Sequence, residues 1–208
     1  MTDFRKSITP ALQWMQESGK TPFAFQLEAW RHYLNGDSGI VNAPTGSGKT
    51  YSLMVPLVLN GLANRSWENR LQAIWITPIR ALAREIQHAG QEVAEGLRVG
   101  WQISIRTGDT GTQERRAQID RAPQILITTP ESVHLLLATR GYADYFADMK
   151  VVIVDEWHEL MGSKRGVQME LALSRLKSIA SNLRIWGISA TIGNMKQSME
   201  VLFGNWVR

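Results

Sequence analysis

A glycine-rich segment that ends in lysine and threonine could bind the phosphates of a nucleotide. Residues 43–50 read Ala-Pro-Thr-Gly-Ser-Gly-Lys-Thr, after a short apolar run and before a segment that can form a helix. Glycine lets the backbone turn tightly, so that successive N–H groups and the start of the helix face the anion. Lys49 would reach the outer phosphates, and the Thr50 hydroxyl would bind Mg²⁺. The expected nucleotide contacts are Thr45, Gly46, Ser47, Gly48, Lys49 and Thr50.

Two adjacent acids, Asp155 and Glu156, could supply the metal ligand and the water-activating group that hydrolysis requires. They follow Val-Val-Ile-Val at 151–154, a run typical of a parallel strand buried on both faces. Ligands of open α/β sheets bind at the carboxyl ends of such strands. We therefore expect Asp155 to hold Mg²⁺ through water and Glu156 to polarise the attacking water. A surface acidic pair is the alternative interpretation.

Gln26 lies shortly before the phosphate loop, in the aromatic segment Phe-Ala-Phe-Gln at 23–26. A glutamine amide can pair with an adenine edge through its donor and its acceptor, and an aromatic ring can stack on the base. Taken alone, Gln26 is more typical of a helix surface. The order of the elements favours the adenine contact, and both interpretations stay open.

Small hydroxyl residues follow several of the predicted buried strands, at Thr77, Thr107, Thr128-Thr129 and Ser189. In a parallel sheet these ends share one edge, the edge that carries the phosphate loop. Hydroxyl and backbone N–H groups there suit a phosphodiester backbone, although each residue alone is more typical of a helix cap. Arg80, Arg106 and the loop 163–166 add positive charge. Their joint placement predicts a nucleic-acid path beside the nucleotide site.

Strands alternate with helices along the chain, which predicts an α/β fold with a mostly parallel central sheet of about six or seven strands and helices on both faces. Thr9-Pro10 favours a helix that begins at residue 10 and ends at Gly19. Another helix is expected from Asn194 to Phe203. We expect a helical extension at 1–22 and one domain at 23–208.

The composition is that of a globular protein, with 44% hydrophobic and 20% charged residues among 208. The formal net charge of +4 permits a polyanionic partner. The chain has no cysteine, which excludes disulfides and thiolate metal sites and fits the cytoplasm. No apolar run approaches the ~20 residues of a membrane span, and no signal peptide is evident. We expect a cytoplasmic protein, in the bacterial cytoplasm or nucleoid, with no membrane partner.

These motifs, taken in order, resemble the first motor domain of a superfamily 2 DExH-box helicase, a RecA-like P-loop NTPase. The series comprises Phe25-Gln26, the loop 43–50, Thr-Pro-Ile-Arg-Ala-Leu at 77–82, Thr-Pro-Glu-Ser at 129–132, Asp-Glu-Trp-His at 155–158 and Ser-Ala-Thr at 189–191. Ala43 replaces the first glycine of the general phosphate-loop pattern, as in the looser helicase form. The stretch 155–168 is similar to the large helicase-related (Lhr) family, and Trp157 and residues 163–166 point to its branch associated with DNA ligase.

The resemblance implies a role for each matching residue. Gln26 would select adenine, and Lys49, Asp155, Glu156 and His158 would be catalytic, with ATP and Mg²⁺ as cofactors. Thr50 and Asp155 would be the metal partners. His158 would couple hydrolysis to movement through Ser189 and Thr191. The implied nucleic-acid contacts are Thr77, Arg80, Thr107, Asp109, Thr129, Lys164 and Arg165. Trp157 occupies a variable position, where simple packing is at least as good an interpretation.

The resemblance further implies single-stranded DNA as the favoured partner, with RNA or a hybrid as alternatives, movement 3′ to 5′, and repair partners such as a DNA ligase or a nuclease. Motors of this kind place ATP between two such domains, the second of which supplies an arginine finger. The sequence holds one phosphate loop and one acidic strand, so we expect a first motor domain whose partner domain is absent. It should bind ATP·Mg²⁺ weakly and turn over little.

Three other functions fit parts of the pattern. A translocase could remodel complexes without unwinding, and a non-motor module could use nucleotide to gate its binding to a strand or protein. A small-molecule P-loop kinase is disfavoured because no segment for an acceptor substrate is evident.

Overall fold

The computed structural model describes residues 4–44, 46–63, 70–190 and 202. In that part of the chain six strands form one sheet in which every neighbouring pair is parallel, in the order β1-β6-β5-β2-β4-β3. The strands are β1 (Gly39–Asn42), β2 (Ala73–Ile76), β3 (Ile103–Arg106), β4 (Ile125–Thr128), β5 (Val151–Val154) and β6 (Arg184–Ser189). The predicted parallel α/β sheet is therefore confirmed.

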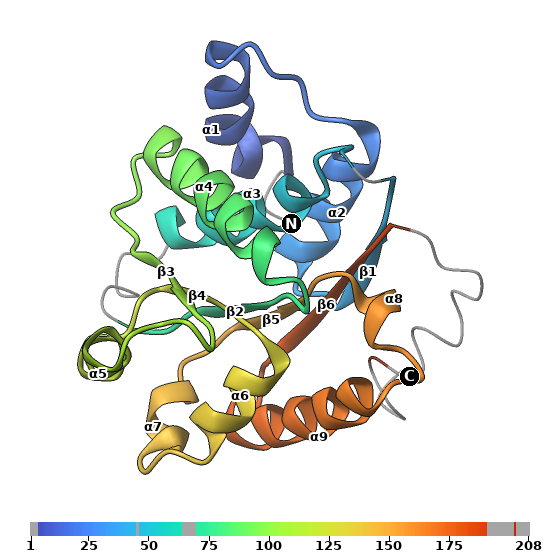
Figure 1. The fold of residues 1–208 in the computed structure, drawn as a ribbon. Helices are drawn as coiled ribbons and strands as arrows, with labels where there is room; N and C mark the ends of the chain where they lie inside the picture. The colour runs from blue at the N-terminus through green and yellow to red at the C-terminus, as the bar shows by residue number, and fades with distance from the viewer. Residues whose placement is uncertain (1–3, 45, 64–69, 191–201, 203–208) are drawn as a thin grey trace.

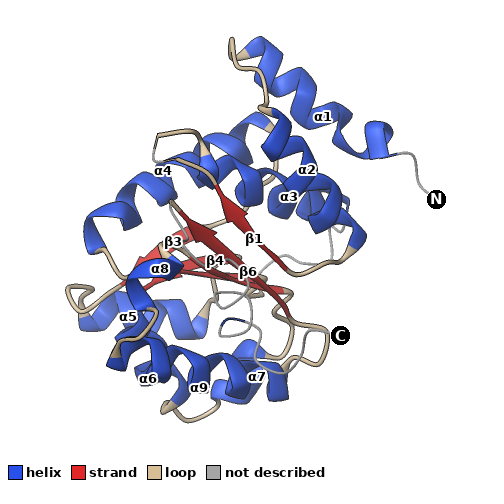
Figure 2. Cartoon of the chain, turned by 90° about the vertical axis from the view of Figure 1, so that its right-hand side faces the viewer, coloured by secondary structure: helices blue, strands red, loops and turns tan. Residues whose placement is uncertain are grey.

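Helices cover both faces of the sheet, so the fold has three layers (Figures 1 and 2). One face carries α1 (Phe4–Glu17), α2 (Ala24–Asn35), α3 (Lys49–Ala63) and α4 (Arg80–Gly96). The other carries α6 (Pro130–Leu137), α7 (Tyr142–Phe146), α8 (Trp157–Leu160) and α9 (Lys164–Ile179). The remaining helix, α5 (Thr112–Asp120), lies beside the edge strand β3.

The central strands are apolar on both sides because each side faces a separate core. On β5, Val151 and Ile153 pack with α1–α4, whereas Val152 and Val154 pack with α6–α9. Successive side chains of a strand point to opposite faces, so a continuous apolar run satisfies both cores. Trp157 is fully buried in the second core, which supports its interpretation as a packing residue.

The first helix differs from the prediction. α1 begins by Phe4, and Pro10 lies inside it instead of opening it. A proline inside a helix removes one hydrogen bond and costs ~3 kcal/mol. Here the buried stripe Ile8, Ala11, Trp14 and Met15 joins the core beneath α1 and offsets that cost.

The same packing bears on the expected domain boundary. α1 belongs to the segment 1–22 that we expected to be an extension, yet it shares the core with α3; the boundary stays a prediction. The predicted helix at 194–203 lies outside the described residues, apart from Leu202. None of the described helices is long and apolar enough to cross a membrane.

Candidate nucleotide site and nucleic-acid edge

The glycine-rich segment forms a tight turn between β1 and α3, as predicted. Gly46 and Gly48 have left-handed φ angles of 78° and 77°, a conformation that costs other residues about 1–2 kcal/mol. α3 begins at Lys49, so its free N–H groups start directly after the turn. Thr45 lies outside the described residues. The backbone of the turn is shaped to face an anion.

The side chain of Gln26 is hydrogen-bonded to the backbone of this turn. Its side chain is 2% exposed, which excludes the helix-surface interpretation. Its Nε2 donates to the Gly48 carbonyl at 2.8 Å, and its Oε1 accepts from the Phe23 N–H at 2.9 Å. An amide has two N–H donors and two lone pairs, and these two bonds use one of each. Phe23 is 57% exposed and stacked on Phe25, with 5.9 Å between ring centroids.

A polar cluster fixes the first turn of α3 to the neighbouring elements. The Tyr51 hydroxyl donates to Glu92 of α4 at 2.5 Å, and the Trp30 indole N–H donates to the Tyr51 carbonyl at 3.0 Å. Lys20 pairs with Glu92 and lies over the rings of Trp14 and Tyr51. Burial opposes ionisation of Glu92, but the hydrogen bonds from Lys20 and Tyr51 outweigh it and lower the pKa of Glu92.

Lys49 and Glu156 meet beneath the phosphate loop. Lys49 is 8% exposed, and its Nζ lies 3.7 Å from Glu156 Oε1. That separation exceeds a hydrogen bond, and no acceptor in the described part of the chain bonds to the buried ammonium. A buried charge without hydrogen bonds is costly. The Lys49 ammonium therefore has N–H groups with which it can bind an anionic ligand.

Asp155 is held at the end of β5 by two donors. Its Oδ2 accepts from the Trp75 indole N–H at 3.2 Å, and its Oδ1 accepts from the Glu156 N–H at 2.9 Å. Burial raises the pKa of Asp155 to about 6, and the charge of Glu156 adds to this shift. A bound cation would reverse it, because a neighbouring positive charge favours the ionised carboxylate.

A chain of contacts joins Glu156 to the end of β6. Glu156 has a left-handed φ of 47°, a strained backbone conformation that is common at functional sites. Its Oε2 lies 3.3 Å from His158 Nδ1, and the same nitrogen lies 2.9 Å from the buried Ser189 hydroxyl. The predicted contact of His158 with Ser189 is present. Thr191 lies outside the described residues.

The cavity at this site fits a nucleotide phosphate with its metal. It has a volume of about 240 Å³ and is lined by Gly46, Gly48, Lys49, Thr50, Leu82, Glu85, Ile86, Asp155 and Glu156. Within the described residues no three His, Cys, Asp or Glu side chains gather as a metal cage. Mg²⁺ often binds instead through one or two protein groups, phosphates and water. Thr50 and Asp155 border this cavity and could supply such groups.

Five of the predicted nucleic-acid residues follow β2, β3 or β4, and the other two, Lys164 and Arg165, begin α9. The threonines there are buried and locally bonded. Thr77 is fully buried and its hydroxyl bonds to the Ile79 backbone. Thr129 caps α6 by accepting from the Ser132 N–H, and the Thr107 hydroxyl accepts from the Asp109 N–H at 3.3 Å. These three hydroxyls therefore bond to backbone groups next to the strand ends and stabilise the turns there.

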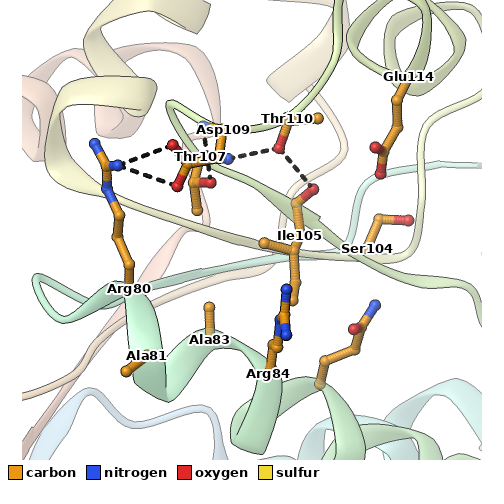
Figure 3. Close-up of a pocket in the computed structure, with 11 residues that line it drawn as sticks. Arg80, Ala81, Ala83, Arg84, Ser104, Ile105, Thr107, Asp109, Thr110 and Glu114 are labelled. Atoms are coloured by element: carbon orange, nitrogen blue, oxygen red, sulfur yellow. Dashed lines mark hydrogen bonds and ion pairs between the residues drawn. The ribbon is translucent and has the colours of Figure 1, made fainter.

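The basic residues of the edge are more exposed. Arg80 at the start of α4 points towards Asp109 and bonds to both of its carboxylate oxygens (Figure 3). Arg165 in the first turn of α9 bonds to Glu131 Oε1 at 2.7 Å and to the Pro78 carbonyl at 3.4 Å. Lys164 beside it is exposed. A second cavity, of about 660 Å³, runs from Arg80 along α4 and β3 towards Glu114.

Two residues of the site were missed at the level of sequence. Trp75 belongs to the apolar run Ala-Ile-Trp-Ile that precedes Thr77, and Glu131 belongs to the motif at 129–132, but the sequence assigns neither residue a role. A buried indole N–H usually has a hydrogen-bond partner, so the sequence could have predicted a polar partner for Trp75. Asp155 could be named as the partner only once β2 and β5 are known to be neighbours, with Trp75 opposite Ile153.

The fold and the site together define a P-loop nucleotide-binding domain of the α/β class, with a cation and two carboxylates beneath its phosphate loop. A family model for the DEAD/DEAH box helicases matches residues 23–198. The chain therefore belongs to the DEAD/DEAH box helicase family.

Curated relatives agree with this assignment. The chain is 34% identical to "ATP-dependent helicase Lhr-Core" of Methanocaldococcus jannaschii, over 94% of this chain and 25% of the relative. It is also 34% identical to "Lhr helicase/uracil glycosylase" of Escherichia coli, over 95% of this chain and 14% of the relative. The chain thus spans a quarter or less of these relatives.

Solved structures confirm the RecA-like fold. Mycobacterium smegmatis helicase Lhr, bound to ssDNA and AMP-PNP, matches with a TM-score of 0.83 and 29% identity over 94% of this chain and 26% of that chain. The DEAD-box helicase Mss116 matches with a TM-score of 0.78 over 97% of this chain and 41% of that chain, at 19% identity, and so shows the fold alone.

Proposed function

We propose that this chain is the first motor domain of an ATP-dependent DNA helicase or translocase of the Lhr type. It binds ATP with Mg²⁺ in the cavity beneath the phosphate loop and a single strand along the ends of β2, β4 and β3. The observation that carries the proposal is the Lys49 ammonium, which is buried without a hydrogen-bond acceptor among the described residues and lies 3.7 Å from Glu156.

Each residue of the nucleotide site has a distinct task in this proposal. Phe23 and Gln26 contact the adenine, and Lys49 binds the phosphates. Mg²⁺ would be held by Thr50 and Asp155, where it would neutralise charge on the phosphates. Glu156 orients the attacking water and takes its proton. The contact from Glu156 through His158 to Ser189 passes the state of the nucleotide to β6.

The partner domain, the direction of movement and the pathway belong to the same proposal. The relatives are at least four times the length of the matched region, which supports a longer motor in which a second RecA-like domain closes on ATP. The resemblance to Lhr helicases supports single-stranded DNA, movement 3′ to 5′, a role in DNA repair and a cytoplasmic location.

The test is ATP turnover and ATP binding by this chain, with and without single-stranded DNA, compared with Glu156→Gln. We expect both proteins to bind ATP·Mg²⁺. Both should turn over little, because the second RecA-like domain that the proposal requires is not added in this assay. Glu170→Gln, an exposed change of the same type on α9, is the control. If neither protein binds ATP, the proposal is wrong. Strong DNA-stimulated turnover that Glu156→Gln abolishes would instead show that the chain completes its own site.

A further inference from the structure

Two arginines on the proposed nucleic-acid edge, the exposed Arg80 and the partly exposed Arg165, are each paired with a carboxylate from a neighbouring strand end. Arg80 follows β2 and pairs with Asp109, which follows β3. Arg165 begins α9 and pairs with Glu131, which follows β4. These are the arginines expected to contact phosphate, so an acid beside each of them requires an explanation.

The Arg80 pair is built on a rigid turn. Arg80 Nη1 lies 3.2 Å and 3.1 Å from the two carboxylate oxygens of Asp109. The guanidinium lies against the backbone of Gly108, where an added Cβ would be 2.9 Å from Nη2. Arg115 donates to the Thr107 and Gly108 carbonyls at 3.0 Å and 2.8 Å. The backbone of the loop that carries Asp109 is therefore fixed, and the bonds of Thr107 with Asp109 and Thr110 within this loop are visible in Figure 3.

The Arg165 pair joins the starts of two helices. Arg165 Nε lies 2.7 Å from Glu131 Oε1, and Nη2 bonds to the Pro78 carbonyl. Burial opposes ionisation of Glu131, but its backbone hydrogen bond and the Arg165 guanidinium lower its pKa below the ordinary value. Glu131 is therefore a negative charge at neutral pH, fixed beside the proposed path.

Stability does not account for these pairs, because exposed ion pairs contribute only ~0–1 kcal/mol. The side chains are 59% and 76% exposed in the Arg80 pair and 43% and 53% exposed in the Arg165 pair. Carboxylate and phosphate oxygens are both charged acceptors for a guanidinium. Asp109 presents two oxygens to Nη1 of Arg80, and Glu131 presents one oxygen to Nε of Arg165. Each acid thus occupies the position that a phosphate would take, and its charge opposes a bound strand.

We propose that Asp109 and Glu131 are internal substitutes for phosphate. In the free protein they hold the two guanidinium groups in the orientation that binds a strand. When a phosphodiester binds, it replaces the carboxylate, and when it leaves, the ion pair forms again. The acids therefore lower the affinity for the strand and its dependence on salt, which favours rapid exchange of phosphates. This inference rests on the proposed function, since it assumes a strand on this edge.

The test measures binding of fluorescent oligothymidylate by anisotropy over a range of NaCl concentrations, for Asp109→Asn, Glu131→Gln and the double variant. We expect each single change to raise the affinity about two- to fivefold, the range of an exposed charge pair. The logarithmic salt slope should steepen by up to about 0.7 per change, as for one more neutralised phosphate of a single strand.

Asp148→Asn is the matched control. Asp148 precedes β5 and pairs with the exposed Arg70, which precedes β2. This pair therefore lies at the amino ends of the strands, away from the proposed nucleic-acid edge. The change removes one charge from the same kind of pair and should leave affinity and slope unchanged. If Asp148→Asn has the same effect as Asp109→Asn, net charge is the cause and the inference is overturned.

Arg80→Gln and Arg165→Gln separate the two proposals. If they weaken binding while the acid variants leave affinity and slope unchanged, or lower the affinity, only the phosphate-substitute inference fails. If the arginine variants bind as the wild type does, or if no protein binds the strand, the proposed nucleic-acid edge itself is wrong. Circular dichroism of each variant shows that it is folded.

Discussion

Lys49 Nζ lies 3.7 Å from Glu156 Oε1, so the cation of the phosphate loop and the acid that we propose to activate water face each other directly. The two residues are 107 positions apart in the numbering (156 − 49) and come from α3 and from the end of β5. In the absence of phosphate the carboxylate is the nearest counter-charge of the ammonium. ATP would take over this role and release Glu156 to orient water.

Lys49→Met should abolish most nucleotide binding without unfolding the protein. Charge-assisted hydrogen bonds contribute ~1.5–3 kcal/mol, which corresponds to a roughly 10- to 100-fold loss of affinity. Removal of the ammonium ends the burial of a cation that has no hydrogen-bond acceptor among the described residues, but it also leaves the buried Glu156 without this counter-charge. These effects oppose each other, so the melting temperature should change little. Calorimetry of ATP·Mg²⁺ binding and thermal melting provide the two readouts. Lys150→Met, just before β5, is the control and should bind normally.

Asp155→Asn should change how stability depends on pH. Burial raises the pKa of Asp155 from 3.8 to about 6 in the folded protein. The folded state therefore holds the proton more tightly than the unfolded chain, and ionisation destabilises the fold as pH rises from 4 to 6. Between these pH values the wild type should lose on the order of 2–3 kcal/mol relative to Asp155→Asn.

Urea unfolding of both proteins in EDTA at pH 4, 5, 6 and 7 measures this difference. The variant also loses one hydrogen bond, because the asparagine oxygen cannot accept from both Trp75 and the Glu156 backbone. That loss is the same at every pH and leaves the slope unaffected. Parallel curves for the two proteins would contradict the raised pKa of Asp155.

Gly48→Ala should damage the phosphate loop more than Gly46→Ala. Both positions have left-handed φ angles, so alanine is strained by about 1–2 kcal/mol at either one. At Gly48 the added Cβ would also lie 2.9 Å from Gln26 Nε2, whereas at Gly46 it meets no atom within 4 Å. Gly48→Ala should therefore have the lower melting temperature and the weaker ATP binding. Equal losses of melting temperature and ATP affinity in the two variants would show that the Gln26 side chain moves away from the added Cβ without cost.

Ser189→Ala should separate nucleotide binding from the response to nucleic acid. The Ser189 hydroxyl is 2.9 Å from His158 Nδ1 and does not line the phosphate cavity. We expect ATP affinity to stay within twofold, with ~1 kcal/mol of stability lost with the hydrogen bond. Stimulation of hydrolysis by single-stranded DNA, measured in the full-length motor, should fall.

Ser178→Ala on the exposed face of α9 is the control for this experiment, since its hydroxyl bonds only locally to the Arg175 carbonyl. Unchanged DNA stimulation in Ser189→Ala would exclude the contact with His158 as the coupling path.

Much of the fold follows from local pattern. The apolar runs at 73–76, 124–128 and 151–154 predict buried strands, and each contains a strand of the sheet. The alternation with helices predicts that these strands are parallel, as they are. The predicted start of α1 is wrong because the preference of Pro10 for a first helical turn is a local signal. The packing of Trp14 and Met15 into the core outweighed it, and only the assembled fold contains that packing.

The sequence by itself determined the chemistry of the site: the phosphate loop, the acidic pair, and the threonines and arginines at the strand ends. These are properties of residue type and short spacing, which a chain carries in any conformation. Asp155 and Glu156 follow an apolar run, and this position already predicts a metal ligand and a general base at the carboxyl end of a strand.

Tertiary structure alone decided which of these residues meet. The order β1-β6-β5-β2-β4-β3 puts Glu156 beside Lys49 and His158 beside Ser189. It also puts Asp109 and Glu131 within reach of Arg80 and Arg165. Such contacts depend on the order of strands across the sheet. That order is set by how both cores pack at once, a global balance that no local stretch of residues contains.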